Sequence, residues 1–334
     1  MGRWLVLGGT RFLSRTVAAT ALARGHDVVC VARGESGDIP DGAKLVVADR
    51  DVPGSLDVLR GERFDAVVDV ARMSYAWVRD ALDALAGDAA HWSFVSTISV
   101  YADSATHGSD SSAELLAPLE AIDDDHPADA PDTYGALKVA GENAVRATFG
   151  DAGLVVRAGL ICGPGDLSDR FGYWPARFVT GGRAVVPDTP GHPAQIVDVR
   201  DLATFIVEGG ERRIGGTFDG SGPRTTLGAL LDEVADAVGA PDLDRVALSP
   251  DALVAAGVEP WSGPRSLPLW LSAADQGMVA RDTSAVAAAG LRARSIGDTA
   301  RAALEHERKL GINRERRAGL NPSDERTILA SVAG

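Results

Sequence analysis

The stretch Trp4-Leu-Val-Leu-Gly-Gly-Thr-Arg-Phe-Leu-Ser14 decides the fold of this 334-residue chain. An apolar run ends at two glycines, and apolar residues then return with helical spacing at Val17, Ala18, Leu22 and Ala23. This pattern predicts a strand, a tight turn and a helix. The N-terminal amides and the positive dipole end of such a helix are placed to hold a pyrophosphate.

The segment Gly25-His-Asp-Val-Val-Cys-Val-Ala32 supplies a second strand. It completes a strand–helix–strand unit of about 30 residues, the size that a dinucleotide site requires. A G-x-x-G-x-x-G spacing is met only at Gly8, because Arg11 and Ser14 occupy the other two glycine positions. The turn alone therefore also fits an α/β protein that binds no dinucleotide. The rest of the sequence is needed to choose between these two interpretations.

Short apolar runs alternate with helical stretches along the first half of the chain. Near-continuous Val/Ile/Leu runs are typical of strands covered on both faces, so we predict an α/β fold with a Rossmann-type, doubly wound parallel sheet. Such sheets bind ligands beyond the carboxyl ends of their strands, so Gly8, Ala32, Ala71 and Ser96 should face one crevice. The predicted strands are Trp4–Leu7, Val28–Ala32, Lys44–Val47, Ala66–Ala71, Trp92–Ser96 and Leu154–Cys162.

The sequence pattern changes near Gly163, after which the predicted helices and strands are shorter and are separated by Pro and Gly. We predict a dinucleotide-binding Rossmann domain over residues 1–162 and a smaller, irregular substrate-binding domain over residues 163–334. Part of residues 195–215 should return to the first domain. Helices are expected at Thr226–Val238 and Asp298–Leu310, the second after the capping-box spacing Ser295-Ile-Gly-Asp298.

Composition excludes several classes of protein. The net charge of −14 opposes nucleic-acid binding, which usually needs a basic face. No apolar run approaches the roughly 18–20 residues of a membrane span, and the chain passes directly into its first strand without room for a signal peptide. Cys30 and Cys162 lie in apolar runs and suggest buried thiols. The six histidines lack metal-ligand spacing, so we expect no metal site. These features predict a cytoplasmic protein that acts on a small molecule.

A second chemical signal is Tyr134-Gly-Ala-Leu-Lys138. Residues four apart share a helix face, and a nearby ammonium lowers the pKa of a phenol toward neutral pH. The strand before it ends in the hydroxyls of Ser96 and Thr97, where a substrate would lie. Thr97 can hydrogen-bond a substrate oxygen on which charge develops. Local turn capping is the alternative for Ser96, Thr97 and Ser99. The segment 103–132, rich in Asp, Ser, Ala and Pro, is expected to be a surface excursion or a mobile flap.

With these motifs the chain resembles the extended short-chain dehydrogenase/reductases, in their NAD-dependent epimerase/dehydratase branch. The resemblance spans nearly the whole chain in the right order. It is carried by Leu7-Gly-Gly-Thr-Arg-Phe-Leu13, Phe94-Val-Ser-Thr-Ile-Ser-Val-Tyr101, Tyr134-x-x-x-Lys138, Arg157-Ala-Gly-Leu-Ile-Cys-Gly-Pro164 and Gln195-Ile-Val-Asp-Val-Arg-Asp201.

The resemblance implies a catalytic set of three residues. Tyr134 would be the general acid/base, Lys138 would tune its pKa and anchor the nicotinamide ribose, and Thr97 would contact the substrate oxygen. A homodimer through a four-helix face is implied as well. Dehydratase members carry an acidic pair after the Thr97 position, whereas Ile98 and Ser99 stand here. This departure disfavours 4,6-dehydration and favours hydride transfer or epimerisation.

The expected cofactor site centres on the glycine turn and favours NADP over NAD. The position that would bind an adenosine ribose hydroxyl with an acid reads Val31-Ala32-Arg33-Gly34. Arg33, with Arg11, could clamp a 2′-phosphate, although Arg33 could also be a solvated surface arginine. Asp49 is placed either to bind adenine or to form a plain turn. The predicted cofactor-binding residues are Gly8, Gly9, Thr10, Arg11, Phe12, Leu13, Arg33, Asp49, Ala71 and Lys138.

Two arginines among aromatic residues follow the sixth strand. Arg170 and Arg177 suit a diphosphate or carboxylate, and Tyr173 or Trp174 could stack a ring. The alternative is a domain-interface cluster in which the guanidinium groups pair with Asp166 or Asp169. Two further substrate-binding candidates are Arg265 and Gln195. An arginine that often precedes the Gln195 strand in sugar-nucleotide enzymes is replaced by Ala194, which weakens the case for such a substrate.

The favoured function is an NADP(H)-dependent oxidoreductase that acts at a ketone or secondary alcohol of a sugar, sugar nucleotide or polyhydroxylated metabolite. An epimerase that keeps its NAD through the cycle is the alternative. A different class, a non-catalytic NAD(P) sensor or a relative of chloroplast RNA-binding proteins, also shares the Gly-Gly-Thr-Arg-Phe opening. The acidic charge opposes RNA binding, and the intact set Thr97, Tyr134 and Lys138 opposes a mere sensor.

Overall fold

Seven parallel strands form the central sheet of the first lobe, in the order β11-β6-β5-β4-β1-β2-β3. The computed structural model describes residues 1–130 and 132–331. Pro131, in the predicted excursion, and residues 332–334, the end of the predicted second domain, lie outside the described residues. The strands are β1 Arg3–Leu7, β2 Asp27–Ala32, β3 Lys44–Val47, β4 Ala66–Asp69, β5 Trp92–Thr97, β6 Leu154–Ala158 and β11 Gly216–Gly220. The predicted doubly wound parallel sheet is confirmed.

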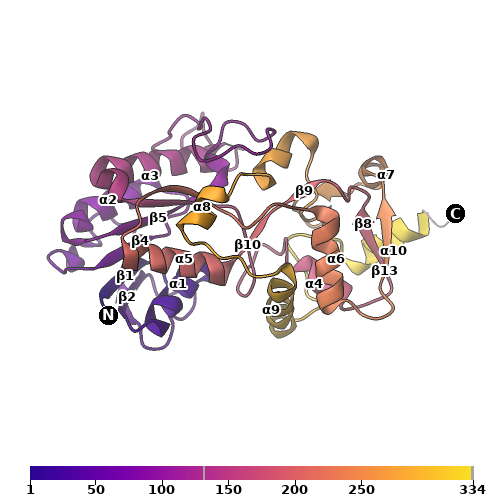
Figure 1. The fold of residues 1–334 in the computed structure, drawn as a ribbon, viewed down its shortest axis with the longest axis horizontal. Helices are drawn as coiled ribbons and strands as arrows, with labels where there is room; N and C mark the ends of the chain where they lie inside the picture. The colour runs from indigo at the N-terminus through magenta and orange to yellow at the C-terminus, as the bar shows by residue number, and fades with distance from the viewer. Residues whose placement is uncertain (131, 332–334) are drawn as a thin grey trace.

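Helices cover both faces of this sheet (Figure 1). On one face α1 (Phe12–Ala23) packs against α5 (Val199–Arg212), and on the other α2 (Tyr75–Leu85) packs against α3 (Thr133–Phe149). Strands β4, β5 and β6 are buried at every residue, which explains their uninterrupted apolar character. The two helical layers therefore leave the carboxyl edge of the sheet as the place for a ligand.

The predicted strand Leu154–Cys162 is interrupted at Gly159. A Cβ on Gly159 would lie 2.0 Å from Oγ of Ser221, so only glycine allows this approach. The chain leaves the central sheet there, and β7 (Leu160–Cys162) pairs instead with β10 (Ile196–Asp198). At this break the chain leaves the first lobe and enters the second.

The return to the first lobe is longer than the predicted part of residues 195–215. Helix α5 shares a hydrophobic cluster with α1, and β11 extends the central sheet beyond it as far as Gly220. Apolar residues of the later segment 284–291, which contains α8 (Ser284–Ala289), join the same cluster. The second lobe is therefore built from three separate parts of residues 163–331, which lie before β10, between β11 and α8, and after α8.

The second lobe has its own hydrophobic core and lies beside the sheet lobe (Figure 1). The predicted second helix begins two residues earlier than expected, at Ile296, with Ser295 Oγ accepting the Asp298 amide at 3.1 Å. The lobe contains α4 Tyr173–Phe178, β8 Arg183–Pro187, β9 Pro193–Ala194, β12 Thr225–Thr226, α6 Leu227–Val238, β13 Asp244–Leu248, α7 Pro250–Ala255, β14 Glu259–Pro260, β15 Ser266–Leu267, α9 Ile296–Leu310 and α10 Pro322–Ser331. No helix among the described residues has the length and hydropathy that a bilayer crossing needs.

The first part of the predicted excursion is tied to the rest of the molecule. Gly108 donates its amide to the carbonyl of Ala280 at 2.8 Å, and Asp282 donates to the carbonyl of Ser109 at 3.0 Å. The buried Arg157 guanidinium also donates to the carbonyl of Ser111. These bonds favour the surface excursion over a mobile flap for residues 103–116.

Candidate active site

The glycine turn has the geometry of a phosphate-binding turn. Gly8 and Gly9 adopt φ values of 130° and 107°, and a Cβ on Gly9 would lie 2.5 Å from Sγ of Cys30. Helix α1 then begins at Phe12 with no side-chain cap and no acidic residue in its first turn. Its first amides are therefore free of side-chain acceptors and face the carboxyl edge of the sheet, which fits a pyrophosphate.

The loop after β2 closes over this turn. Thr10 Oγ1 lies 3.0 Å from Ser36 Oγ, and Arg11 Nε donates to the carbonyl of Ser36 at 2.8 Å. The Arg33 side chain is half exposed, and its nitrogens lie 3.9 Å from an Asp51 oxygen and 4.0 Å from a Glu35 oxygen. Such long, exposed ion pairs hold Arg33 weakly, so its guanidinium is available to an anion. Asp49 accepts the amide of Asp51 at 3.0 Å, which is the plain-turn arrangement.

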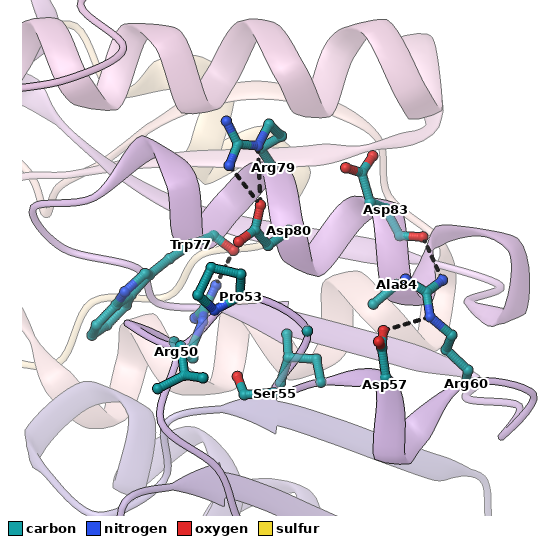
Figure 2. A pocket seen from close by; sticks show the side chains of 13 residues that line it. Arg50, Pro53, Ser55, Asp57, Arg60, Trp77, Arg79, Asp80, Asp83 and Ala84 are labelled. Atoms are coloured by element: carbon teal, nitrogen blue, oxygen red, sulfur yellow. Dashed lines mark hydrogen bonds and ion pairs between the residues drawn. The ribbon is translucent and has the colours of Figure 1, made fainter.

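A buried ion pair supports the backbone at Ala71. Arg50 Nη1 lies 2.8 Å from Asp69 Oδ1, and this same carboxylate oxygen accepts the Ala71 amide at 2.9 Å. Figure 2 shows Arg50 reaching the carbonyl of Trp77, at the edge of a cavity of about 230 Å³. Two further pairs of charged residues line the cavity, Arg60 with Asp57 and Arg79 with Asp80. We therefore assign this region a supporting role.

Thr97 and Tyr134 come together because α3 approaches the end of β5 unusually closely. A Cβ on Gly135 would lie 2.0 Å from the carbonyl oxygen of Ser99, so the helix can reach this segment only with glycine there. Thr97 is buried, and its Oγ1 lies 3.2 Å from both the amide nitrogen and Oγ of Ser99. The capping contact predicted as an alternative is thus present, and it fixes the Thr97 hydroxyl beside Tyr134.

Opposing effects act on the phenol of Tyr134. Burial raises the pKa of Tyr134 above the ordinary value of a phenol, and the Thr97 hydroxyl and the positive charges of Arg72 and Arg170 offset this rise only in part. Arg72 is not among the site residues predicted from the sequence. The available signal was its position directly after Ala71, at the carboxyl edge of β4, where a ligand is expected.

Lys138 is fully buried and binds the protein backbone. Its Nζ donates to the carbonyls of Ala71, at 2.6 Å, and Val95, and it lies 4.2 Å from the centre of the Phe94 ring. Burial lowers the pKa of Lys138 to about 7, against the charges of Asp69 and Glu142. The positive charges of Arg72 and Arg170 lower the pKa of Tyr134, and the tuning by Lys138 that the sequence suggests stays a prediction.

Arg170 is held between two groups near Tyr134. Its guanidinium carbon lies 4.8 Å from the centre of the Trp261 ring, and its Nε lies 3.3 Å from Ser168 Oγ. Ser168 Oγ donates in turn to Asp166 at 3.0 Å. Burial lowers the pKa of Arg170, and the Asp166 carboxylate opposes this shift. Arg170 is therefore the one residue of the predicted arginine–aromatic cluster that the structure brings toward Tyr134.

The other substrate candidates on α4 lie in the second lobe. Arg177 pairs with Glu325 at 2.7 Å, and neither Asp166 nor Asp169 is its partner. Tyr173 and Trp174 are buried at 2 % and 0 % exposure in the core of that lobe. The alternative of a structural cluster therefore describes Arg177, Tyr173 and Trp174, because Arg177 pairs with Glu325 and both aromatic side chains belong to the core of the second lobe.

Gln195 and Arg265 also have structural partners. The Gln195 amide group donates to the carbonyls of Gly222 and Arg281 and accepts the Arg281 amide, which uses its polar atoms within the protein. Arg265 pairs with Asp324 and donates to the carbonyl of Ala256. Neither side chain is placed to contact a ligand beside Tyr134.

A buried polar network that the sequence did not reveal supports the site from behind. The fully buried Glu142 accepts two-pronged hydrogen bonds from Arg157 and a 2.5 Å hydrogen bond from Ser96, the neighbour of Thr97. Tyr101 connects Arg157 to Asp219, and Arg281 completes the network. Its partners lie far apart in sequence, so spacing alone could not find it.

The sequence profile described as the NAD dependent epimerase/dehydratase family matches residues 4–212, most of the chain. The chain belongs to this family. A search among curated proteins finds no match.

Solved structures of other proteins share the fold. WbmH from Bordetella bronchiseptica, solved with NAD+, has 18% identity and a TM-score of 0.62, and the match covers 93% of this chain and 100% of WbmH. UDP-N-acetylglucosamine 4-epimerase from Bacillus cereus has 17% identity and a TM-score of 0.65, with 92% and 96% coverage. WbmG from Bordetella bronchiseptica, solved with NAD and UDP, has 18% identity and a TM-score of 0.64, with 93% and 96% coverage. At these identities the likeness establishes the fold.

Proposed function

We propose that this member of the family is an NADP(H)-dependent oxidoreductase that transfers hydride at a ketone or secondary alcohol. The observation that carries the proposal is the meeting of the Thr97 and Tyr134 hydroxyls at the carboxyl edge of β5. It depends on the close approach of α3 to the segment after β5 at Gly135. Lys138 follows Tyr134 by one helical turn, as the extended short-chain enzymes require.

In this mechanism Tyr134 exchanges a proton with the substrate oxygen. During reduction the phenol would donate its proton to the oxygen as negative charge develops there, and during oxidation the phenolate would accept it. Thr97 Oγ1 would donate a hydrogen bond to the same oxygen. Arg72 and Arg170 would stabilise the phenolate against the cost of burial.

The nicotinamide cofactor would supply or accept the hydride. We propose that the residues of the turn from Gly8 to Leu13 hold its pyrophosphate, because the first amides of α1 lack side-chain acceptors. Lys138 would hold the nicotinamide ribose, and its two backbone carbonyl contacts fix the ammonium for that role. Arg33 and Arg11 would hold a 2′-phosphate, which favours NADP over NAD.

Two arginines beside the acid/base residue suggest a negatively charged substrate. Among the described residues, neither Arg72 nor Arg170 forms an ion pair within 4 Å, yet both act on the pKa of Tyr134. A phosphate or carboxylate on a sugar nucleotide or polyhydroxylated metabolite would neutralise the charges of these two arginines. The substrate would enter between the lobes, with Trp261 holding Arg170 in place.

An epimerase with permanently held NAD is the second candidate. It is favoured by the structural neighbours, among which a 4-epimerase and NAD complexes occur. Dehydration stays disfavoured, because the buried, apolar Ile98 stands where a dehydratase needs an acid. A dimer through α2 and α3 would accompany either reaction.

The absorption spectrum of the purified protein separates the two candidates. A nicotinamide band that survives gel filtration supports the epimerase. An empty protein that binds NADPH on titration and oxidises it with a carbonyl substrate supports the reductase. If purified protein neither carries nor binds any nicotinamide cofactor, both candidates are wrong.

A further inference from the structure

A buried carboxylate ends the fully buried strand β4. Asp69 is 0% exposed and follows three buried apolar residues, Ala66–Val68. Its partner is Arg50, whose side chain is 7% exposed and whose Nη1 and Nη2 lie 2.8 Å and 3.1 Å from the two oxygens of Asp69. The desolvation of two buried charges offsets most of what such a pair gains. The stability of the fold alone therefore does not account for the pair.

The pair spans the loop between β4 and α2. Arg50 Nη2 donates at 2.6 Å to the main-chain carbonyl of Trp77, in the first turn of α2 (Figure 2), while Nη1 binds Asp69 at the end of β4. Residues 70–74, which join the two elements, are thus held on both sides by one guanidinium. This contact is with the main chain of Trp77, so it does not require the indole side chain.

The loop carries two groups of the candidate active site. Asp69 Oδ1 accepts the amide of Ala71 at 2.9 Å, and the carbonyl of Ala71 accepts Nζ of Lys138 at 2.6 Å. The next residue is Arg72, whose charge acts on Tyr134. The position of the loop therefore decides where the Lys138 ammonium and the Arg72 guanidinium lie.

Charges of both signs act on the Lys138 ammonium. Burial lowers the pKa of Lys138 to about 7, Asp69 from β4 and Glu142 from α3 oppose this shift, and Arg50 from the loop after β3 adds to it. The direct contacts of the ammonium are two main-chain carbonyls and an aromatic ring, which carry no net charge. Asp69 is thus connected to Lys138 by hydrogen bonds through the backbone and by its charge.

We propose that Asp69 is a positioning residue, which holds the Lys138 ammonium through Ala71 and supplies negative charge to it. Arg50 is its partner in this role, because it fixes the loop on both sides. An ammonium has three N–H donors, and two of them bind main-chain carbonyls of the described residues, which leaves one for a ribose hydroxyl of the cofactor. In this last step the proposal rests on the function proposed above.

The test is an NMR titration of the full chain labelled with lysine that carries ¹³C at the ε carbon. The chain has only three lysines, and the signals of the exposed Lys44 and Lys309 are assigned with Lys44→Arg and Lys309→Arg. Asp69→Asn should lower the titration midpoint of Lys138 by roughly one pH unit, because the amide keeps an acceptor for the backbone but removes the charge. Arg50→Gln should raise the midpoint.

These opposite shifts distinguish the proposal from a loss of structure. A loosened loop would admit water to Lys138 and raise its midpoint in both variants, since hydration favours the charged form. The double variant Asp69→Asn/Arg50→Gln leaves neither partner uncompensated, and its midpoint should lie below that of Arg50→Gln even where Asp69→Asn does not fold. The matched control is Asp80→Asn, which removes a carboxylate of α2 that pairs with Arg79 (Figure 2) and should leave the midpoint unchanged.

Calorimetric titration with NADPH is the second readout. At pH 6.5 Asp69→Asn should bind NADPH about fivefold more weakly than the wild type, because most of its Lys138 is then neutral and a neutral donor forms a weaker hydrogen bond.

The proposal is overturned if Asp69→Asn leaves the Lys138 midpoint unchanged or raises it, or if the double variant titrates at or above Arg50→Gln. It is also overturned if Asp69→Asn binds NADPH as tightly as the wild type. A wild type that binds no nicotinamide cofactor contradicts the proposed function instead, and the titration of Lys138 then decides the role of Asp69 by itself.

Discussion

The guanidinium carbon of Arg170 lies 4.8 Å from the centre of the Trp261 indole ring. Trp261 belongs to the second lobe, where it adopts a φ of 66°, and Arg170 follows the strand through which the chain leaves the first lobe. The charge of Arg170 lowers the pKa of Tyr134. The second lobe thus positions a cation beside the acid/base residue.

Trp261→Leu should therefore weaken substrate binding and shift the pH profile of turnover upward. A partly buried cation–π contact contributes about 1–2 kcal/mol, so we expect a roughly 5- to 30-fold loss in kcat/KM. Trp77→Leu is the matched control. The guanidinium carbon of Arg50 lies 5.1 Å from the centre of the Trp77 ring, and this contact is separate from Tyr134. If the pH profile of turnover is the same in Trp261→Leu as in the wild type, Arg170 does not act on Tyr134.

Tyr134→Phe should abolish turnover while leaving cofactor affinity within a few fold. It removes the transferable proton and keeps the ring, and general acid/base catalysis contributes about 10²–10⁴ in rate. The comparison is kcat of both proteins on the true substrate, together with titration of the cofactor. A variant that keeps more than roughly a tenth of the wild-type kcat would show that another group moves the proton.

The sequence predicted the sheet and placed the hydroxyls of Ser96 and Thr97 at the end of a strand, because both depend on local patterns. Apolar runs define buried strands, and the carboxyl edge of the sheet gathers the ends of those strands. The sequence did not predict that the return of the chain to the first lobe extends as far as β11. This strand has the sequence Gly-Thr-Phe-Asp-Gly and lacks the apolar run of its neighbours.

The substrate side could not be predicted in the same way. Arg177 finds its partner at Glu325, 148 residues later, and no spacing rule points to that residue. Asp169 likewise binds Arg314, 145 residues away. The nearest carboxylates in sequence were the natural expectation, but the tertiary packing of α10 and segment 312–321 decided the pairs.

Arg33 should decide the choice of cofactor. We expect NADP(H) to bind more tightly than NAD(H), because a guanidinium contact with a phosphate contributes about 1.5–3 kcal/mol. Arg33→Ala should erase this preference without unfolding the protein, since the Arg33 side chain is 52% exposed. Titration of both cofactors into both proteins checks this. Equal wild-type affinities, or a ratio that the variant leaves unchanged, would contradict the NADP assignment.

Lys138 should make stability depend on pH. Burial lowers its pKa in the folded protein from 10.5 to about 7, so between these values the unfolded chain binds more protons. The wild type should therefore gain stability relative to Lys138→Met as pH rises from about 7 toward 10.5. Below that window the charged, buried ammonium keeps its full penalty. Denaturant unfolding of both proteins across the window measures the difference in stability between them. A difference that stays constant across the window would show that the ammonium remains charged in the folded protein.

Arg177→Ala should lower the melting temperature by several degrees and leave KM unchanged. The Arg177 and Glu325 side chains are 15% and 7% exposed, and Arg177 also donates to Thr180 Oγ1 and the carbonyl of Gly181. Truncating one partner of a buried pair leaves the other charge uncompensated, which costs about 3–5 kcal/mol.

The control for this prediction is Arg183→Ala. Arg183 lies near Asp244 at 3.8 Å, but both side chains are about half exposed or more, so this pair should contribute about 1 kcal/mol at most. Its melting temperature should stay close to that of the wild type. A double variant that also carries Glu325→Gln should recover part of the loss in Arg177→Ala, because the uncompensated carboxylate is then neutral. An Arg177→Ala protein with an unchanged melting temperature and a raised KM would return Arg177 to the substrate site and show that the pair with Glu325 opens in solution.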